Sequence, residues 1–566
     1  MRARTVYRRL ARLYPRPAEG AKELERPLAF LGWKLSPSLV TRAGYGSGVL
    51  VGGVGLGLTL LVPAAFRLAA FLSTLALASG VAYLVQQSPK LYATARRTRA
   101  LGAAPDLVAR AVLSMRLEPV PERAASFSAS SGDGALAASL ATHVRQSQYT
   151  TTSALSSFGD EWAALFPSIR RSFALVLAAG SAPAHDRGRI LDRALSVVLS
   201  GTRDRMASFA ADIRGPAAAL YAFGVLLPIA LIALLPAAGV AGLAVTPVSV
   251  TVLYGFVLPA VVCAGAVWLL VRRPVAFPPP EVPRDHPEVS DRTRVAVVVA
   301  TGLAVTGWLV AGGFFPSWAP PVAAGGLGVG GFLWIRSQPV IAVYERSRAV
   351  ESQLADALEL VGRRVANGRA VETALARAAA ELDGPMGETL AAAVRQQRQL
   401  QVGVREAFLG RHGVLRRVPS PRVRGSMALL ALAAHEGRPA GGALLALAEH
   451  VDDLRTIEQE ARHSLAHICR TLVSTGAAFA PMVAGATVAM AGTLGTSRIP
   501  GASTSLPWLG GIVGWYVLVL AVLLPALATG LRRGLDRALL CQQIGRALVC
   551  ATCVYLFSFK LVGLVI

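Results

Sequence analysis

The sequence predicts an all-α, polytopic membrane protein with about nine transmembrane helices and two duplicated cytoplasmic helical bundles. Of its 566 residues, 53% are hydrophobic and only 16% are charged, which is more apolar than a soluble core of this size requires. The apolar residues gather in runs of about 20, the length that crosses a bilayer core as a helix. The order of apolar runs and polar stretches also occurs twice along the chain. We therefore expect the apolar excess to lie in lipid.

Basic residues alternate with the apolar runs in a way that orients the chain. Arg67 and Arg498 are the only basic residues in the short loops predicted to lie outside, whereas all but about three of the 57 basic residues fall in segments predicted to be cytoplasmic. This alternation predicts a multi-pass protein of the cell membrane, with its N-terminus in the cytoplasm and its C-terminus outside. It also explains the net charge of +24, so the charge does not indicate nucleic-acid binding. The predicted spans are 43–62, 68–85, 216–239, 249–271, 295–315, 320–335, 472–494, 507–530 and 547–566.

These spans divide the chain into segments that alternate between membrane and cytoplasm. The two large polar segments, each of about 130 residues, are predicted to be helical domains, and the Pro-rich segment between the halves is predicted to be a stiff connector. The predicted order is a basic N-terminal segment (1–42), transmembrane hairpin 1 (43–85), cytoplasmic helical domain 1 (86–215), hairpin 2 (216–271), a Pro-rich linker (272–294), hairpin 3 (295–335), cytoplasmic helical domain 2 (336–471), hairpin 4 (472–530), and a cytoplasmic loop with the ninth helix (531–566).

An internal repeat relates the two halves. Residues 140–146 match 390–396, and Asp133-Gly134 matches Asp383-Gly384, at the same offset of 250 residues. Both copies run in the same direction through the membrane, so the repeat is parallel, unlike the inverted repeats of many transporters. A second match, of 172–175 with 426–429 at an offset of 254, indicates a small insertion in the later copy.

Apolar periodicity predicts helices in the polar segments. Leu354, Leu358, Val361 and Val365 form one stripe at spacings of four, three and four residues. Asn367-Gly368 is predicted to end that helix, because glycine accepts a left-handed conformation. By contrast, the Ser-rich stretch 126–132 is predicted to be a loop. Glycine-rich faces at 46–53 and 325–331 predict close helix packing rather than a site.

The chain lacks the residues that nucleotide hydrolysis and ion-coupled transport require. None of the four lysines follows a glycine, which excludes a Walker-type phosphate loop. The predicted spans contain no Asp or Glu, which argues against a proton- or ion-coupled transporter. Prolines at 228, 259, 481 and 525 could kink their helices, as part of either a fixed shape or a moving element.

Two pairs of potential metal ligands are interpreted as structural. His463 and His467 could share a helix face near Glu460, but no third His or HExxH motif accompanies them. Cys550 and Cys553 lie inside an apolar run without a second pair, which favours helix packing. We therefore expect no catalytic, cofactor-binding or metal-binding residues.

The chain resembles the type II secretion system F domain proteins, the membrane platforms of type II secretion, type IV pilus and archaellum machines. The resemblance rests on the order hairpin, helical domain, hairpin, taken twice, on the run 220–228, and on the helix breaks Gly437-Arg438-Pro439 and Ala182-Pro183. Two domains and a ninth helix are more similar to the archaeal platform proteins than to the shorter bacterial ones. The first domain departs from the Gly-x-Pro pattern, which indicates that it has diverged.

The resemblance implies partners rather than a reaction. It implies that the helical domains contact a hexameric secretion ATPase, that the membrane part holds pilin or archaellin subunits within membrane lipid, and that the chain forms a homodimer. Basic residues predicted as ATPase contacts are Arg363, Arg364, Arg416, Arg417, Arg422, Arg424, Arg532 and Arg533. The alternative for these arginines is contact with anionic lipid. The acidic residues Asp452, Asp453, Glu458 and Glu460 are interpreted as a solvated helix face.

Two other classes of function remain open at this point. A transporter or channel built from two parallel repeats would show flux in proteoliposomes without an ATPase. A membrane enzyme would need a His, Asp or Ser constellation at the membrane face, which the sequence does not contain. A non-enzymatic assembly platform is therefore the favoured interpretation.

Overall fold

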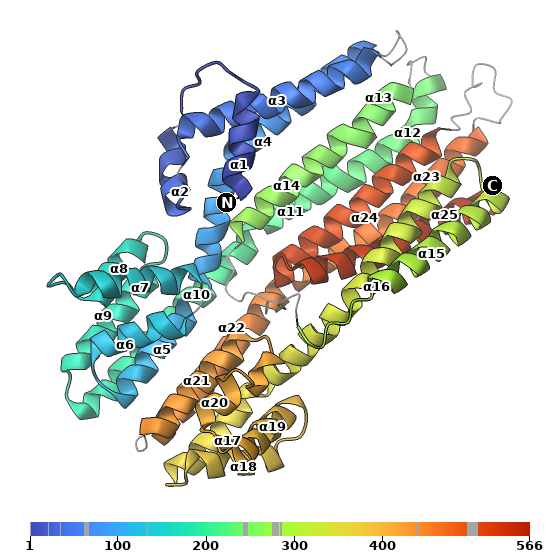
Figure 1. Ribbon diagram of the computed structural model, residues 1–566. Coiled ribbons are helices and arrows are strands. Elements are labelled where there is room, and N and C mark those ends of the chain that lie inside the picture. Colours follow the sequence, from blue (N-terminus) through green and yellow to red (C-terminus); the bar gives the residue numbers. More distant parts are fainter. Residues whose placement is uncertain are drawn as a thin grey trace.

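The computed structural model describes residues 2–20, 22–33, 35–60, 67–132, 134–240, 247–273, 282, 286–436, 440–494 and 508–565. Within these ranges the regular structure is entirely helical, as the sequence predicts. Long helices lie alongside one another at one end of the molecule, and two compact helical domains lie at the other end (Figure 1). The predicted Pro-rich stretch 277–283 and the breaks at 133 and 437–439 fall mostly or wholly outside the described residues.

Among the described residues, six helices are long and apolar enough to cross a membrane, which indicates a multi-pass membrane protein. The predicted spans 43–62, 68–85 and 320–335 overlap other helices, α3 (Pro37–Leu60), α4 (Arg67–Leu101) and α16 (Ala319–Ser352). These three are not among the six, so the count of nine spans stays a prediction. The six are Ala184–Leu234, Pro247–Arg272, Thr293–Phe314, Gly441–Gly492, Leu509–Arg533 and Arg537–Val565.

Close contacts at glycines hold the long helices together. α16 packs along α15 (Thr293–Phe314) and α25 (Arg537–Val565), and a Cβ added to Gly328 would lie 2.9 Å from Ala304 Cβ. At Gly330 an added Cβ would lie 2.9 Å from Val549 Cγ2. The glycine-rich face at 325–331 therefore packs against neighbouring helices, as predicted.

Each helical domain has its own apolar core. Domain 1 buries Leu136, Phe158 and Phe173, and domain 2 buries Leu358 and Phe408. In domain 1 the helices are α5 (Ala104–Leu117), α6 (Pro121–Ser131), α7 (Ala135–Ser147), α8 (Ala154–Ala163), α9 (Pro167–Ser181) and α10 (Ala184–Asp212). In domain 2 they are α17 (Leu354–Ala366), α18 (Val371–Glu381), α19 (Pro385–Leu400), α20 (Val404–Leu409), α21 (Pro421–Glu436) and α22 (Ala440–Ser474).

The structure supports the internal repeat. The starts of α5, α6, α7 and α8 precede those of α17, α18, α19 and α20 by the predicted offset of 250 residues. Gly134 and Gly384 precede α7 and α19 and share a φ of +96°, which favours glycine. The two domains are therefore built alike, down to an equivalent turn.

Local predictions in the domains had mixed outcomes. Leu354, Leu358 and Val361 are buried as the stripe predicts, and Gly368 has a φ of +82° just beyond the end of α17. The predicted loop at 126–132 is wrong, because these residues belong mostly to α6 and Ser128 is fully buried. Its serine and alanine side chains are small enough for α6 to pack closely against α5 and α7.

In the part of the chain that the structure describes, three π-helical turns interrupt the long helices, and each ends two residues before a proline. They are η3 (Ala222–Leu226), η4 (Leu253–Val257) and η6 (Thr475–Phe479), and they precede Pro228, Pro259 and Pro481. Proline lacks the N–H and clashes with the carbonyl four residues earlier, so the helix widens at this point. η3 joins α11 (Arg214–Tyr221) to α12 (Leu227–Val240), η4 joins α13 (Pro247–Val252) to α14 (Leu258–Arg272), and η6 joins α22 to α23 (Ala480–Leu494).

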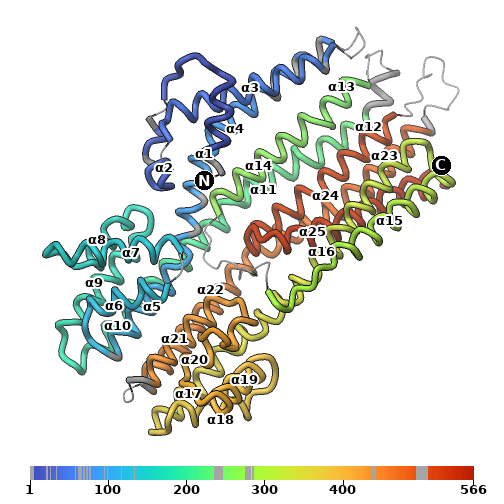
Figure 2. Tube along the Cα trace, viewed as in Figure 1, coloured from blue at the N-terminus to red at the C-terminus, as the bar shows by residue number. Residues whose placement is uncertain are grey.

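The remaining helices complete both ends of the chain. α1 (Arg2–Arg12) and α2 (Glu25–Phe30) pack against the hairpin of α3 and α4, and α24 (Leu509–Arg533) lies within the bundle of long helices. The chain trace in Figure 2 follows α22 from domain 2 into that bundle. Each domain is thus joined to the long helices by helical segments at both of its ends, α4 and α10 for domain 1 and α16 and α22 for domain 2.

Candidate functional site

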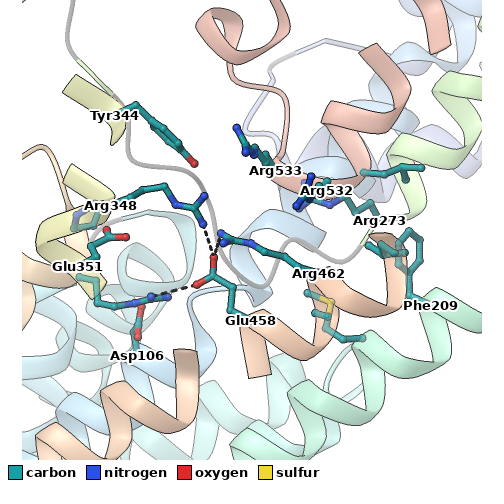
Figure 3. A pocket seen from close by; sticks show the side chains of 16 residues that line it. Asp106, Phe209, Arg273, Tyr344, Arg348, Glu351, Glu458, Arg462, Arg532 and Arg533 are labelled. Atoms are coloured by element: carbon teal, nitrogen blue, oxygen red, sulfur yellow. Dashed lines mark hydrogen bonds and ion pairs between the residues drawn. The ribbon is translucent and has the colours of Figure 1, made fainter. Parts of the chain in front are cut away.

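A charged cavity lies where the two helical domains meet the long helices. Its volume is about 80 Å³, whereas a single water needs about 10–15 Å³ on the same measure. Six arginines and three carboxylates line it, so three positive charges have no carboxylate counterpart in its walls. Figure 3 shows these side chains converging from several helices. The charged lining residues are Asp106, Glu351, Glu458, Arg273, Arg348, Arg422, Arg462, Arg532 and Arg533.

Glu458 of α22 is the centre of the ion pairs in the cavity. Its carboxylate lies 3.6 Å from Arg348 Nη2 and 3.4 Å from Arg422 Nη1, and it also pairs with Arg462 one turn along α22. The Glu458 side chain is only 16% exposed. A single buried carboxylate therefore joins guanidiniums from α16, α21 and α22.

A second set of polar contacts fixes the start of α21 beside the cavity. Ser420 is fully buried, and its hydroxyl donates to Glu351 of α16. The same oxygen accepts the backbone N–H of Val423 at 3.1 Å, which caps the helix. The cap keeps Arg422 directed into the cavity.

The opposite side of the cavity carries three arginines that form no ion pair with the described residues. Arg273 follows the last residue of α14 and is only 9% exposed, and burial lowers its pKa to about 10. Arg532 and Arg533 lie at the end of α24. Within the described part of the chain, none of these three guanidiniums forms an ion pair or a hydrogen bond.

The two domains contact each other beside this cavity. Leu113 of domain 1 packs into the core of domain 2, while Leu454 and Ile457 of α22 pack into the core of domain 1. Arg203 of α10 also pairs with Glu460 of α22. The cavity is therefore bounded by elements that both domains hold in place.

The eight arginines predicted as ATPase contacts lie in different surroundings. Arg363 pairs with Glu359 within α17, and Arg364 pairs with Glu381 at 2.5 Å. Arg422, Arg532 and Arg533 line the cavity instead. Arg416, Arg417 and Arg424 are exposed on domain 2.

The interpretation of Glu458 as part of a solvated helix face is wrong. Its neighbour Glu460 is partly exposed, but Glu458 is turned inward onto three arginines. Only the spacing of Glu458 and Arg462, one helical turn apart, was visible in the sequence. Arg348 and Arg422 come from distant elements, so no local pattern could place them there.

The two residue pairs that were weighed as metal ligands and interpreted as structural are not part of the cavity lining. His463 and His467 are exposed on α22, and Cys550 and Cys553 are exposed on α25. Among the described residues no group of three or more potential ligands is close enough to hold a metal ion.

Comparisons with known proteins gave no match, whether against protein-family models, curated proteins or solved structures.

Proposed function

We propose that this chain is a non-enzymatic membrane platform of a type IV pilus, archaellum-like or type II secretion machine. In this role it couples a cytoplasmic secretion ATPase to filament assembly, with pilin or archaellin subunits held by its membrane part. The proposal includes nine spans, a cytoplasmic N-terminus, an external C-terminus and the resemblance to type II secretion system F domain proteins.

One observation carries this proposal: each helical domain continues into the long helices through a run of consecutive helical segments, with a turn at Ile213 and the π turn η3 in the first run and the π turn η6 in the second. The paths run from Ala184 to Leu234 and from Gly441 to Gly492, 51 and 52 residues. At 1.5 Å per residue each is roughly 75 Å long. A protein without its own nucleotide site must receive work mechanically, and such paths supply stiff connections from domain to membrane.

The test uses the full-length protein in detergent and the hexameric secretion ATPase of the same genome. We expect direct binding and a change in the rate of ATP hydrolysis. The paired charge reversal Arg416→Glu with Arg417→Glu should weaken binding at least about tenfold, because these exposed guanidiniums would face acidic partner surface.

A matched control lies on the same domain. Arg395→Glu with Arg398→Glu makes the same change in charge on the exposed face of α19 and should leave ATPase binding intact. The proposal fails if the full chain binds no secretion ATPase and deletion of its gene leaves filaments unchanged. Flux in proteoliposomes under those conditions would favour the transport alternative.

A further inference from the structure

Arg273 is a buried arginine to which the described residues offer no ion-pair or hydrogen-bond partner. It is 9% exposed, lines the cavity, and forms no ion pair or hydrogen bond with the described residues. A buried cation is costly unless it is paired, so such positions normally hold a counter-charge. The neighbouring Arg272 differs, because it is exposed and its guanidinium lies 4.0 Å from the Trp268 ring centroid.

Two more arginines reach the same end of the cavity from another helix. Leu270 of α14 packs so closely on Gly530 of α24 that a side chain on Gly530 would collide with it. Arg273 and Arg533 each follow this contact by three residues, so the two helix ends lie at one level. Figure 3 shows Arg273, Arg532 and Arg533 on the side of the cavity away from Asp106.

The carboxylates of the cavity do not neutralise these arginines. Glu458 is paired with Arg348, Arg422 and Arg462, and the other two carboxylates, Asp106 and Glu351, interact electrostatically with Arg422. The positive surplus is therefore localised at the ends of α14 and α24. Both helices are candidate membrane-spanning helices, so this end of the cavity lies where a membrane would meet water.

We propose that Arg273, Arg532 and Arg533 form a binding site for a phosphate group. Guanidiniums present several N–H donors in a plane and match phosphate oxygens in paired hydrogen bonds. The phosphate comes either from an anionic lipid headgroup or from solution, and the site chemistry is the same in both cases. This site is independent of the proposed platform function.

The experiment measures the thermal unfolding midpoint of the full-length protein in detergent. One arm adds inorganic phosphate, with sodium chloride at equal ionic strength as its control. The other arm adds phosphatidylglycerol in mixed micelles, with a diacylglycerol of the same acyl chains, which lacks phosphate, as its control. A ligand that binds the folded state raises the midpoint.

Arg273→Gln should weaken the apparent affinity about 10- to 100-fold, the effect of losing hydrogen bonds to a charged group. Arg272→Gln, one residue away and with the same loss of charge, should leave the affinity unchanged. Stabilisation by both ligands supports a site open to solution, and stabilisation by phosphatidylglycerol alone supports a headgroup site.

Either of two results overturns the proposal: neither ligand raises the midpoint, or both variants lose the effect equally. If Arg273→Gln does not fold, Arg532→Gln provides the test, because Arg532 is exposed and its loss leaves the packing intact. An unchanged affinity in Arg532→Gln then overturns the site.

Discussion

At the scale of single residues, the main ion pairs in the cavity join one carboxylate to the guanidiniums around it. Glu458 forms ion pairs with three arginines while its side chain is only 16% exposed. Replacing a whole buried ion-pair network by apolar residues is often harmless, but removing one member leaves uncompensated charge. Glu458 is therefore important because its loss would leave three clustered guanidiniums without a counter-charge.

Glu458→Gln should lower the free energy of unfolding by roughly 3 kcal/mol, because three clustered guanidiniums would lose their shared counter-charge. Glu449→Gln on the same helix is the matched control: Glu449 is exposed, so we expect a change within about 0.5 kcal/mol. Reversible unfolding of the full-length protein by SDS titration measures both. Equal effects of the two substitutions would show that the ion pairs of Glu458 contribute nothing.

At the scale of helical elements, the proline after the π turn η3 leaves a backbone carbonyl that a neighbouring helix pairs. Pro228 cannot donate to Gly224 O, the carbonyl four residues earlier, and Tyr516 of α24 donates its hydroxyl to that oxygen. Tyr254 of η4 donates to Pro228 O at 2.5 Å. Both rings are fully buried and meet edge to face, with centroids 5.4 Å apart. The carbonyl that Pro228 leaves without its usual donor is thus paired inside the bundle, as an apolar environment requires.

Tyr516→Phe should destabilise the protein by about 1 kcal/mol, because Gly224 O would lose its donor within the membrane part. In a Pro228→Ala background the same substitution should cost less, since that background regains a backbone N–H that can donate to the Gly224 carbonyl. A double-mutant cycle from SDS unfolding measures the difference. Strict additivity of the two substitutions would contradict the link between Pro228 and Tyr516.

At the scale of the whole molecule, the sequence predicted the helices and the internal repeat. It did not predict the contacts between helices that are far apart in the chain. Apolar runs and the stripe at Leu354 are patterns within short windows, and the match of Gly134 with Gly384 is a repeat that aligning the two halves detects; the structure agrees with all three. The Glu458 side chain points into the cavity and Arg273 is buried because of contacts between helices that are far apart in the chain. The prolines were visible in the sequence, but which side chain would satisfy Gly224 O was not.

The number of spans determines where the chain ends, and this tests the predicted topology. With nine spans the C-terminus lies opposite both helical domains, whereas an even number of spans would place it on the same side as the N-terminus. Three exposed positions sample these regions: Tyr149 in domain 1, Leu400 in domain 2 and Val565 near the C-terminus. Each can carry a single cysteine in a background where the five native cysteines are replaced by alanine.

A membrane-impermeant maleimide should label Val565→Cys in intact cells, and should label Tyr149→Cys and Leu400→Cys only after the cells are opened. The result follows from the positive-inside distribution of arginine, which places both domains with the basic segments. Labelling of Val565→Cys and Leu400→Cys under the same conditions would place both positions on one side of the membrane. The chain would then have an even number of spans, which contradicts the predicted nine. Labelling of Tyr149→Cys and Leu400→Cys under different conditions would instead break the parallel repeat, because equivalent domains of a parallel repeat must share one side of the membrane.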